Sequence, residues 1–309
     1  MAEQTVYDIL IVGAGPAGLT AAIYARRAQK SVLVLEASSY GGQIINTPEI
    51  ENYPTAPHIS GFDFAVRIYE QAKELGAEIR FEKATGLAVA GDGKKTVTTT
   101  AGTYAARAVI LATGSENRKL GLPNEDALVG RGVSYCATCD GAFYRKKTVA
   151  VVGGGNTALE DALYLSDLAE TVYLIHRRDA FRGDEATVER LKKRENVRFL
   201  YNSTVTALNA GARLESVDVT EKTTGKVTTL AVNGLFVAVG RIPENQNFAS
   251  VIELDEGGYA VAGENCRTRA PGVFVAGDNR TKEVRQLVTA TADGAVAATE
   301  AIRYLSEQN

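Results

Sequence analysis

Cysteine and histidine are scarce in this chain. Its 309 residues include three cysteines, two histidines, one methionine and no tryptophan. Three cysteines cannot build the framework of a disulfide-rich secreted domain. Two histidines leave little for a histidine-rich metal site or for histidine-based catalysis, and we expect no metal. A close pair of cysteines in such a chain is more often redox-active or metal-binding than structural.

An excess of charge and long apolar runs are also lacking. Lys and Arg total 34 against 37 Asp and Glu, a formal net charge of −3. This balance gives no electrostatic basis for binding nucleic acid or an anionic membrane. No apolar run approaches the roughly 18 residues that a transmembrane helix needs. The start, Met1–Gln4, lacks the basic and apolar character of a secretory signal. We therefore expect a cytoplasmic protein.

Glycine, by contrast, is abundant, and a first group follows a predicted buried strand at 7–12. Gly13–Gly18 has the pattern GxGxxG and precedes a predicted helix at 19–29. Glycines at these positions let the backbone approach a pyrophosphate at the N-terminus of the helix. The next predicted strand, 31–36, ends in Glu36, which is placed to bind a ribose hydroxyl. This unit predicts a site for a dinucleotide without a 2′-phosphate.

A second copy of the unit lies 140 residues further along the chain. A predicted strand at 148–152 leads into Gly153–Ala158, where alanine replaces the third glycine, an accepted variant. A helix at 159–168 and a strand at 171–175 are predicted to follow. His176–Arg178 then bring two guanidiniums to the place where the first copy has a carboxylate. Arginine binds a 2′-phosphate, which a carboxylate repels, so this copy predicts an NADPH site.

Two further apolar strands, at 108–114 and 235–240, each end in glycine and are predicted to close one nucleotide domain. Polar links at 115–117 and 241–246 follow them, so the chain crosses between domains twice. We predict an α/β fold with two Rossmann-like, three-layer (ββα) dinucleotide-binding domains. The predicted boundaries are 1–115 with 246–309 for a discontinuous first domain, and 116–245 for the second.

Three other segments complete this prediction. Residues 78–103 alternate apolar and polar side chains around a Gly91–Gly93 turn, which predicts an antiparallel hairpin layer. Residues 272–278 form a predicted strand that ends in Asp, and 286–304 a predicted long helix.

Cys136 and Cys139 form a CxxC pair that is followed by Asp140. A zinc site needs four ligands, but the remaining cysteine, Cys266, is far away in the sequence and both histidines are isolated. A buried structural pair and a reversible disulfide are the other interpretations. Asp140 favours the reversible disulfide, because a carboxylate beside the pair can pass a proton as the reactive thiolate forms. Two dinucleotide sites in the same chain favour it further.

Together these residues resemble the low-molecular-weight, bacterial-type thioredoxin reductases over nearly the whole chain. The most specific stretch of the resemblance is Gly132–Gly141. The residues that match the FAD-binding elements of this family are Gly13, Gly15, Pro16, Ala17, Gly18, Glu36, Gly42, Gln43, Asn52, Ala112, Thr113, Gly114, Gly277, Asp278, Arg285, Gln286 and Leu287. The residues that match its NADPH-binding elements are Gly153, Gly155, Asn156, Thr157, Ala158, His176, Arg177, Arg178 and Arg182.

The resemblance implies an NADPH-dependent enzyme with bound FAD, thioredoxin as its protein substrate, and a homodimer. It also implies three catalytic residues. Cys139 matches the cysteine that faces the flavin, Cys136 the thiol that attacks thioredoxin, and Asp140 the proton donor.

Other functions share this scaffold. A dithiol oxidase needs no NADPH, so the pair Arg177 and Arg178 argues against it. Relatives that take electrons from ferredoxin or another donor have lost the NADPH motifs, which this chain retains. A flavin-bound redox sensor without turnover is a third alternative, and the intact CxxC pair with Asp140 argues against it.

Overall fold

The computed structural model describes residues 5–308, which form two compact units. One unit combines the chain up to Glu116 with the chain from Ile242 onward, and the other is Asn117–Arg241. The chain passes between them in β7 (Ser115–Asn117) and β16 (Arg241–Pro243), which pair as a two-stranded sheet. The sequence predicted polar links at both places, whereas the two backbones hydrogen-bond to each other.

The first unit is built on a seven-stranded sheet. β1 (Val6–Val12) lies between β2 (Val32–Glu36) and β6 (Thr103–Leu111), and both pairings are parallel. β3 (Glu78–Phe81) extends the sheet beyond β2, and β17 (Val273–Val275) pairs with β6, again in parallel. Apart from the edge strand β3, these strands are mostly apolar, as expected where both faces of the sheet are covered.

The same sheet continues into an antiparallel hairpin. β4 (Ala84–Val89) and β5 (Lys95–Thr99) form it, and Gly93 in the turn adopts a positive φ of 83°. The predicted hairpin is therefore present, but the prediction is wrong for β3. Because α2 (Gly61–Glu74) carries the chain across the sheet, β3 returns parallel to β2.

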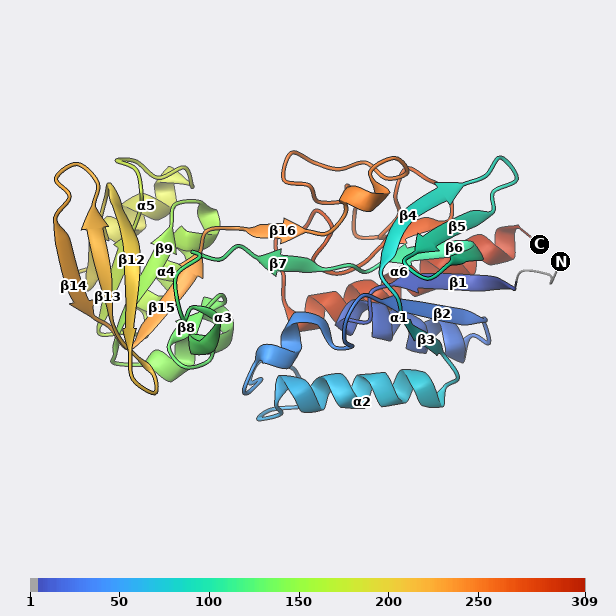
Figure 1. The fold of residues 1–309 in the computed structure, drawn as a ribbon, viewed down its shortest axis with the longest axis horizontal. Helices are drawn as coiled ribbons and strands as arrows, with labels where there is room; N and C mark the ends of the chain where they lie inside the picture. Colours follow the sequence, from blue (N-terminus) through green and yellow to red (C-terminus); the bar gives the residue numbers. More distant parts are fainter. Residues whose placement is uncertain (1–4, 309) are drawn as a thin grey trace. The chain divides into compact units, whose positions relative to one another are not determined.

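Two helices cover the face of the sheet opposite the hairpin. α1 (Pro16–Arg27) and α6 (Leu287–Glu307) pack against each other (Figure 1). A Cβ at Gly294 would lie 2.2 Å from the carbonyl oxygen of Ala17, so only glycine permits this approach. α1 begins at Pro16, before its predicted start at residue 19, because the fixed φ of proline suits the first helical position.

The second unit repeats this plan with a five-stranded parallel sheet. β9 (Thr148–Gly153) lies between β10 (Thr171–Ile175) and β15 (Gly234–Ala238). β11 (Val197–Leu200) and β8 (Val133–Ser134) form its two edges.

Helices cover one face of this sheet and a small β-sheet covers the other. The helices are α4 (Asn156–Ser166) and α5 (Glu185–Lys192). The small antiparallel sheet consists of β12 (Ser203–Ala210), β13 (Leu214–Glu221) and β14 (Val227–Ala231). Each unit is thus a three-layer, Rossmann-like α/β fold, which confirms the predicted fold class.

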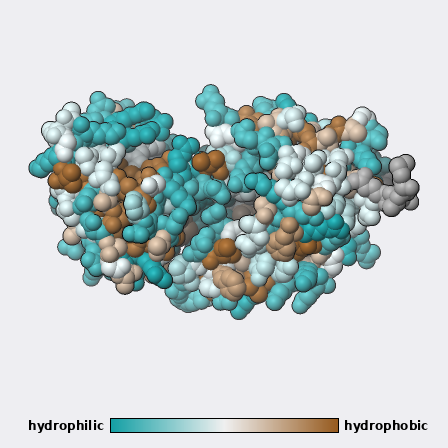
Figure 2. Space-filling model, viewed as in Figure 1, coloured by the Kyte–Doolittle hydropathy of each residue, from teal (hydrophilic) through white to brown (hydrophobic). Residues whose placement is uncertain are grey.

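The remaining elements are short. They are η1 (Gly42–Asn46), η2 (Asp126–Leu128), α3 (Ala137–Asp140), η3 (Gly141–Tyr144) and η4 (Gln246–Phe248). Hydrophilic residues predominate on the face shown in Figure 2. None of the helices between residues 5 and 308 combines the length and the apolar character needed to span a bilayer.

Candidate functional site

The first glycine turn connects β1 to α1 at the carboxyl edge of the sheet. Gly13 has a φ of 107°, and a Cβ there would lie 2.3 Å from the carbonyl oxygen of Ala112. The backbone N–H of Ala14 donates to Oε2 of Glu36 at 2.7 Å. The carboxylate that the sequence predicted to bind a ribose is therefore held against the turn.

The N-terminus of α1 has the properties of an anion site. Its first turn holds no acidic residue, and no described side chain caps it. A Cβ built on Gly15 meets only Gly42, at 4.0 Å, so the space before the helix is open. Uncapped N–H groups at a helix N-terminus bind phosphate. The turn therefore fits the pyrophosphate of a dinucleotide.

The structure also brings together predicted FAD residues from distant parts of the chain. Nδ2 of Asn52 donates to Oε1 of Gln286 at 3.1 Å. Arg285 lies over the ring of Tyr259, 4.2 Å from its centroid, and its Nε donates to the carbonyl oxygen of Asp278 at 3.4 Å. These residues meet where α6 begins.

The other predicted FAD residues line the same edge. Pro16, Ala17 and Gly18 form the first turn of α1, Ala112, Thr113 and Gly114 follow β6, and Leu287 is the first residue of α6. Gly42 and Gln43 are exposed at the start of η1. Asn279 also lies at this edge, although the sequence analysis did not predict it as a site residue. Its Nδ2 donates to Oγ1 of Thr113 at 3.0 Å and so connects the segment after β17 to the segment after β6.

A buried cluster of charges behind this edge was also not predicted. The carboxylate of Asp293 accepts from the N–H of Gly277 at 2.9 Å, from Arg280 through two nitrogens at 2.8 Å each, and from Nζ of Lys282 at 2.9 Å. Burial alone would raise the pKa of Asp293, but the hydrogen bonds from Arg280 and Lys282 outweigh burial and hold that pKa below its usual range. The sequence offered one indication, since Asp293 is the first carboxylate in a helix that begins with small and Thr residues.

The second glycine turn connects β9 to α4. A Cβ at Gly153 would lie 2.3 Å from the carbonyl oxygen of Ala238, whereas Gly155 faces open space. α4 begins at Asn156 rather than at the predicted residue 159, and its first turn has no acidic residue and no side-chain cap among the described residues. Thr157 is exposed and Ala158 is buried on this helix. This turn also fits a pyrophosphate.

His176, a predicted NADPH residue, is buried with 5% of its surface exposed. Its Nε2 lies 3.0 Å from the carbonyl oxygen of Ala180, and its ring stacks on Phe181 with centroids 5.0 Å apart. Its ring occupies the space beside Gly154, where a Cβ would lie 2.0 Å away. Burial lowers the pKa of His176, so the ring is neutral at pH 7. His176 shapes the loop and brings no charge to it.

The loop 177–182 carries the three predicted arginines, all of which are exposed. The N–H of Arg182 donates to the carbonyl oxygen of Gly154 at 2.8 Å. Oδ1 of Asn156 accepts from the N–H of Asp184 at 2.8 Å. Arg177, Arg178 and Arg182 are thus on a loop anchored to the second turn, and exposed guanidiniums of this kind are suited to binding a phosphate.

Cys136 and Cys139 form a disulfide in the second unit, with Cα atoms 5.3 Å apart. Both cysteines are partly exposed, and Sγ of Cys136 lies 3.4 Å from Oγ1 of Thr138. Because the two sulfurs are bonded to each other, the zinc interpretation does not hold. Cys266 is fully buried in the core of the first unit, and burial raises the pKa of its thiol to about 12.

Asp140, at the end of the same short helix, is partly buried. Burial raises the pKa of its carboxyl, and a 2.6 Å hydrogen bond from Oγ of Ser134 opposes that rise. The net effect is that Asp140 keeps its proton at a higher pH than an exposed aspartate. A partly buried acid with a raised pKa next to a disulfide is suited to giving up and regaining a proton.

The segment before the disulfide is also anchored. The buried carboxylate of Glu125 accepts from the N–H groups of 120–122 and from the hydroxyl of Tyr135 at 2.8 Å. Burial raises the pKa of Tyr135, so its hydroxyl stays a donor. This contact fixes the residue that precedes Cys136, and no motif in the sequence predicts it.

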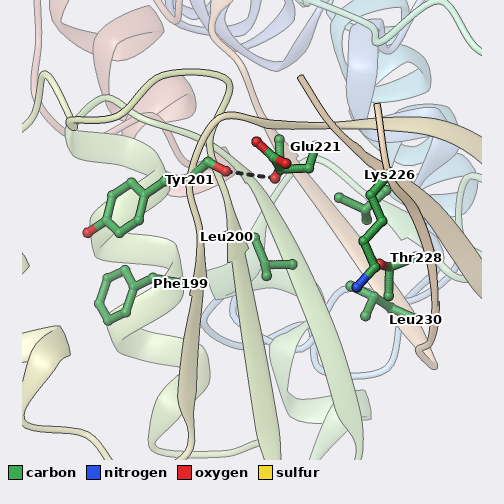
Figure 3. Close-up of a pocket in the computed structure, with 9 residues that line it drawn as sticks. Phe199, Leu200, Tyr201, Glu221, Lys226, Thr228 and Leu230 are labelled. Atoms are coloured by element: carbon green, nitrogen blue, oxygen red, sulfur yellow. Dashed lines mark hydrogen bonds between the residues drawn. The ribbon is translucent and has the colours of Figure 1, made fainter. Parts of the chain in front are cut away.

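A pocket of about 320 Å³ lies elsewhere in the second unit, between the end of β11 and the small antiparallel sheet (Figure 3). In Figure 3 the rings of Phe199 and Tyr201 lie together, and their centroids are 5.8 Å apart. The dashed line marks the 2.7 Å hydrogen bond from Ser203 to the carbonyl oxygen of Tyr201. None of the predicted site residues lines this pocket.

Within residues 5–308, one group of side chains has its potential metal ligands close together. Ligand atoms of Glu49, Glu51 and His58 lie within 4.8 Å of one another in the first unit. Nδ1 of His58 is 2.6 Å from Oε1 of Glu49; the side chain of His58 is largely exposed and that of Glu49 is partly exposed. Exposed acidic groups of this kind are common without a metal.

Comparison with known proteins gives one consistent result. Residues 7–294 match the family model described as pyridine nucleotide-disulphide oxidoreductase. A thioredoxin reductase from Listeria innocua is 44% identical over 308 residues, which are 99% of this chain and 96% of that protein. A bifunctional thioredoxin reductase/thioredoxin from Mycobacterium leprae is 43% identical over 99% of this chain and 67% of its own length. The crystal structure of thioredoxin reductase from Streptococcus pyogenes has a TM-score of 0.93 at 39% identity and covers 99% of this chain and 100% of that one.

Proposed function

The chain belongs to the pyridine nucleotide-disulphide oxidoreductase family and, within it, to the low-molecular-weight thioredoxin reductases, and from this premise we propose that it reduces thioredoxin with electrons from NADPH. The observation that carries the proposal is the Cys136–Cys139 disulfide, with the partly buried Asp140 next to it in the chain. The Listeria innocua relative is a thioredoxin reductase, and the Mycobacterium leprae relative is a bifunctional thioredoxin reductase/thioredoxin.

Each unit offers one cofactor site. We propose that FAD binds at the N-terminus of α1 in the first unit, with Glu36 on a ribose and Asn52, Asp278, Arg285 and Gln286 at the far end of the cofactor. The uncapped helix N-terminus supports this assignment, because it satisfies a pyrophosphate without a side-chain competitor. FAD, when bound, accepts a hydride from NADPH and passes two electrons to the disulfide.

NADPH binds in the second unit in this proposal. The N-terminus of α4 takes the pyrophosphate, and the loop that carries Arg177, Arg178 and Arg182 takes the 2′-phosphate. A guanidinium binds phosphate through two parallel hydrogen bonds, a geometry that a ribose hydroxyl does not match. The proposed specificity therefore depends on the loop and its hydrogen bond to Gly154.

The chain's own thiols carry electrons to the substrate. After reduction, the Cys136 thiolate attacks the thioredoxin disulfide and displaces one thioredoxin thiolate, which leaves a mixed disulfide. The Cys139 thiolate then attacks the sulfur of Cys136 and displaces the second one. One disulfide is formed and one is broken, two electrons pass to thioredoxin, and Asp140 exchanges a proton with the sulfurs.

We also propose that the enzyme is a cytoplasmic homodimer. The family resemblance supports the dimer. The buried thiol of Cys266 and the small number of cysteines suit a reducing compartment. Sedimentation of the purified protein at micromolar concentration tests the dimer directly, and a particle of one chain's mass would contradict it.

A simple experiment tests the proposed function. The purified protein should show a bound-flavin spectrum, and it should oxidise NADPH rapidly only when oxidised thioredoxin is present. A dithiol oxidase would consume oxygen with a small dithiol and without NADPH. A ferredoxin-dependent enzyme would stay inactive with NADPH. Either result would overturn the proposal.

A further inference from the structure

The hydroxyl of Ser134 lies between the backbone of Cys136 and the carboxylate of Asp140. The N–H of Cys136 donates to Oγ of Ser134 at 3.1 Å, and Oγ of Ser134 lies 2.6 Å from Oδ2 of Asp140. A second acceptor, the carbonyl oxygen of Cys136, is 3.3 Å from the same Oγ. Ser134 is buried, with 3% of its surface exposed.

The sheet of the second unit fixes this hydroxyl in place. Ser134 ends β8 and is in register with Phe236 of the neighbouring strand β15. The ring of Phe236 packs edge-on against Tyr144, with centroids 5.2 Å apart. The backbone position of Ser134 is therefore set by the sheet and not by the disulfide.

The three contacts of Ser134 can serve both protonation states of Asp140. A hydroxyl has one hydrogen to donate and can accept from other donors. When Asp140 is ionised, Ser134 donates to it. When Asp140 is protonated, the acid donates to Ser134, and the Ser134 hydrogen turns to the carbonyl oxygen of Cys136. Only hydrogens move between the two arrangements.

Other titratable groups surround Asp140. Tyr144 lies on η3; burial raises the pKa of Tyr144, and the nearby charge of Asp140 adds to that rise. Arg213, on the turn between β12 and β13, acts on Tyr144 in the opposite direction. Tyr164 of α4 packs against Gly141, next to Asp140. Within residues 5–308, Ser134 provides the one side-chain hydrogen bond to the carboxylate of Asp140.

We propose that Ser134 is the positioning residue for Asp140, holding its carboxyl beside the disulfide while the Ser134 hydrogen follows the proton on and off that acid. When two electrons open the disulfide, each sulfur becomes a thiol by taking one proton. Asp140 supplies one of these protons and becomes a carboxylate, and solvent supplies the other. This role depends on the proposed function in one respect only, because the proposed function supplies the two electrons that open the disulfide.

Titration of Asp140 in the oxidised enzyme tests the role without NADPH or thioredoxin. Protein labelled with ¹³C at the aspartate side-chain carboxyls is titrated by NMR, and Asp140→Asn identifies the signal of Asp140. Ser134→Ala removes a hydrogen bond that favours the ionised form, so the pKa of Asp140 should rise by about one to two pH units. Ser134→Gly should give the same shift, which keeps the test open if one variant does not fold. Ser134→Thr keeps the hydroxyl and should restore the wild-type pKa.

Ser166→Ala is the matched control. Ser166 is also buried in the second unit, but its hydroxyl donates to the backbone carbonyl of Leu163 at 2.7 Å. An unchanged Asp140 pKa in Ser134→Ala, or an equal rise in Ser166→Ala, would overturn the proposal. If the wild type fails to reduce thioredoxin, the proposed function fails while this titration stays valid.

A kinetic readout separates positioning from simple support of the fold. The rate of thioredoxin reduction should fall at the pH where Asp140 loses its proton. In Ser134→Ala this pH should move upward by the same amount as the pKa of Asp140 measured by NMR. A lower rate with an unmoved pH profile would show a structural role only and would contradict the inference.

Discussion

The backbone N–H of Arg182 donates a 2.8 Å hydrogen bond to the carbonyl oxygen of Gly154. This bond joins the loop that carries three arginines to the turn in front of α4. In the proposed NADPH site, the pyrophosphate at the turn and the 2′-phosphate at the loop would therefore bind to parts of the backbone that are fixed to each other. The proposed preference for NADPH over NADH depends on this connection.

The first prediction concerns that preference. Each charge-assisted contact is worth about 1.5–3 kcal/mol, roughly tenfold to a hundredfold in kcat/KM. Arg177→Ala/Arg178→Ala should lower kcat/KM for NADPH by at least about tenfold and leave kcat/KM for NADH nearly unchanged. Arg194→Ala, which removes an arginine paired with Asp167 in the same unit, is the control. Equal efficiencies with the two nucleotides in the wild type would contradict the assignment.

The second prediction concerns pH and His176. Burial lowers the pKa of His176 in the folded protein, so the unfolded chain binds its proton first as pH falls. Stability contributed by neutral His176 is present above about pH 6.5, the ordinary histidine pKa. It is lost as pH falls from there toward the folded pKa. Unfolding by urea at pH 7 and pH 5.5 should show a smaller drop in His176→Asn than in the wild type. An identical drop would mean that His176 is not the group that titrates.

The third prediction concerns the charge cluster around Asp293. Because its carboxylate holds the N–H of Gly277, Asp293→Asn should weaken FAD binding as well as folding. Glu300→Gln is the control. Glu300 lies on the same helix, but its carboxylate pairs with Arg267 and not with the N–H of Gly277. Flavin fluorescence gives the dissociation constant of FAD. Equal weakening in both variants would show that Asp293 supports only the helix.

The fourth prediction concerns Cys266. Its buried thiol, with a pKa of about 12, is almost entirely protonated at pH 8 and should not react. Native enzyme reduced with NADPH should therefore release two equivalents of chromophore from a thiol reagent, and unfolded enzyme three. Cys266→Ala should keep full activity, and a loss of thioredoxin reduction in that variant would assign the residue a role that the structure does not show.

Much of the fold could be predicted because its signals are local. A buried strand, a glycine turn and a helix occur twice, and Gly13 and Gly153 are required by backbone contacts that no other residue allows. The helix starts were missed because the first turns of α1 and α4 consist of small and polar residues without an apolar period. β3 was misread because its alternation does not reveal a preceding crossover helix.

The chemistry of the site was less accessible from sequence, because it depends on contacts between distant residues. Asn52 and Gln286 are 234 positions apart, yet their side chains hydrogen-bond. The burial of His176 depends on Phe181 and on the missing Cβ of Gly154. Ser134 belongs to a strand of two residues, and only the structure shows that its hydroxyl meets Asp140.

The most direct test of the electron path uses the variant Cys136→Ser/Cys139→Ser. Hydride transfer needs only the nicotinamide and the flavin, so NADPH should still bleach the bound flavin in an anaerobic stopped-flow experiment. Transfer to a protein disulfide needs an exchange thiol, so NADPH oxidation with thioredoxin should fall to the level measured without thioredoxin. We expect the flavin of this variant to bleach while thioredoxin is no longer reduced. Reduction of thioredoxin at near the wild-type rate would contradict an electron path through Cys136 and Cys139.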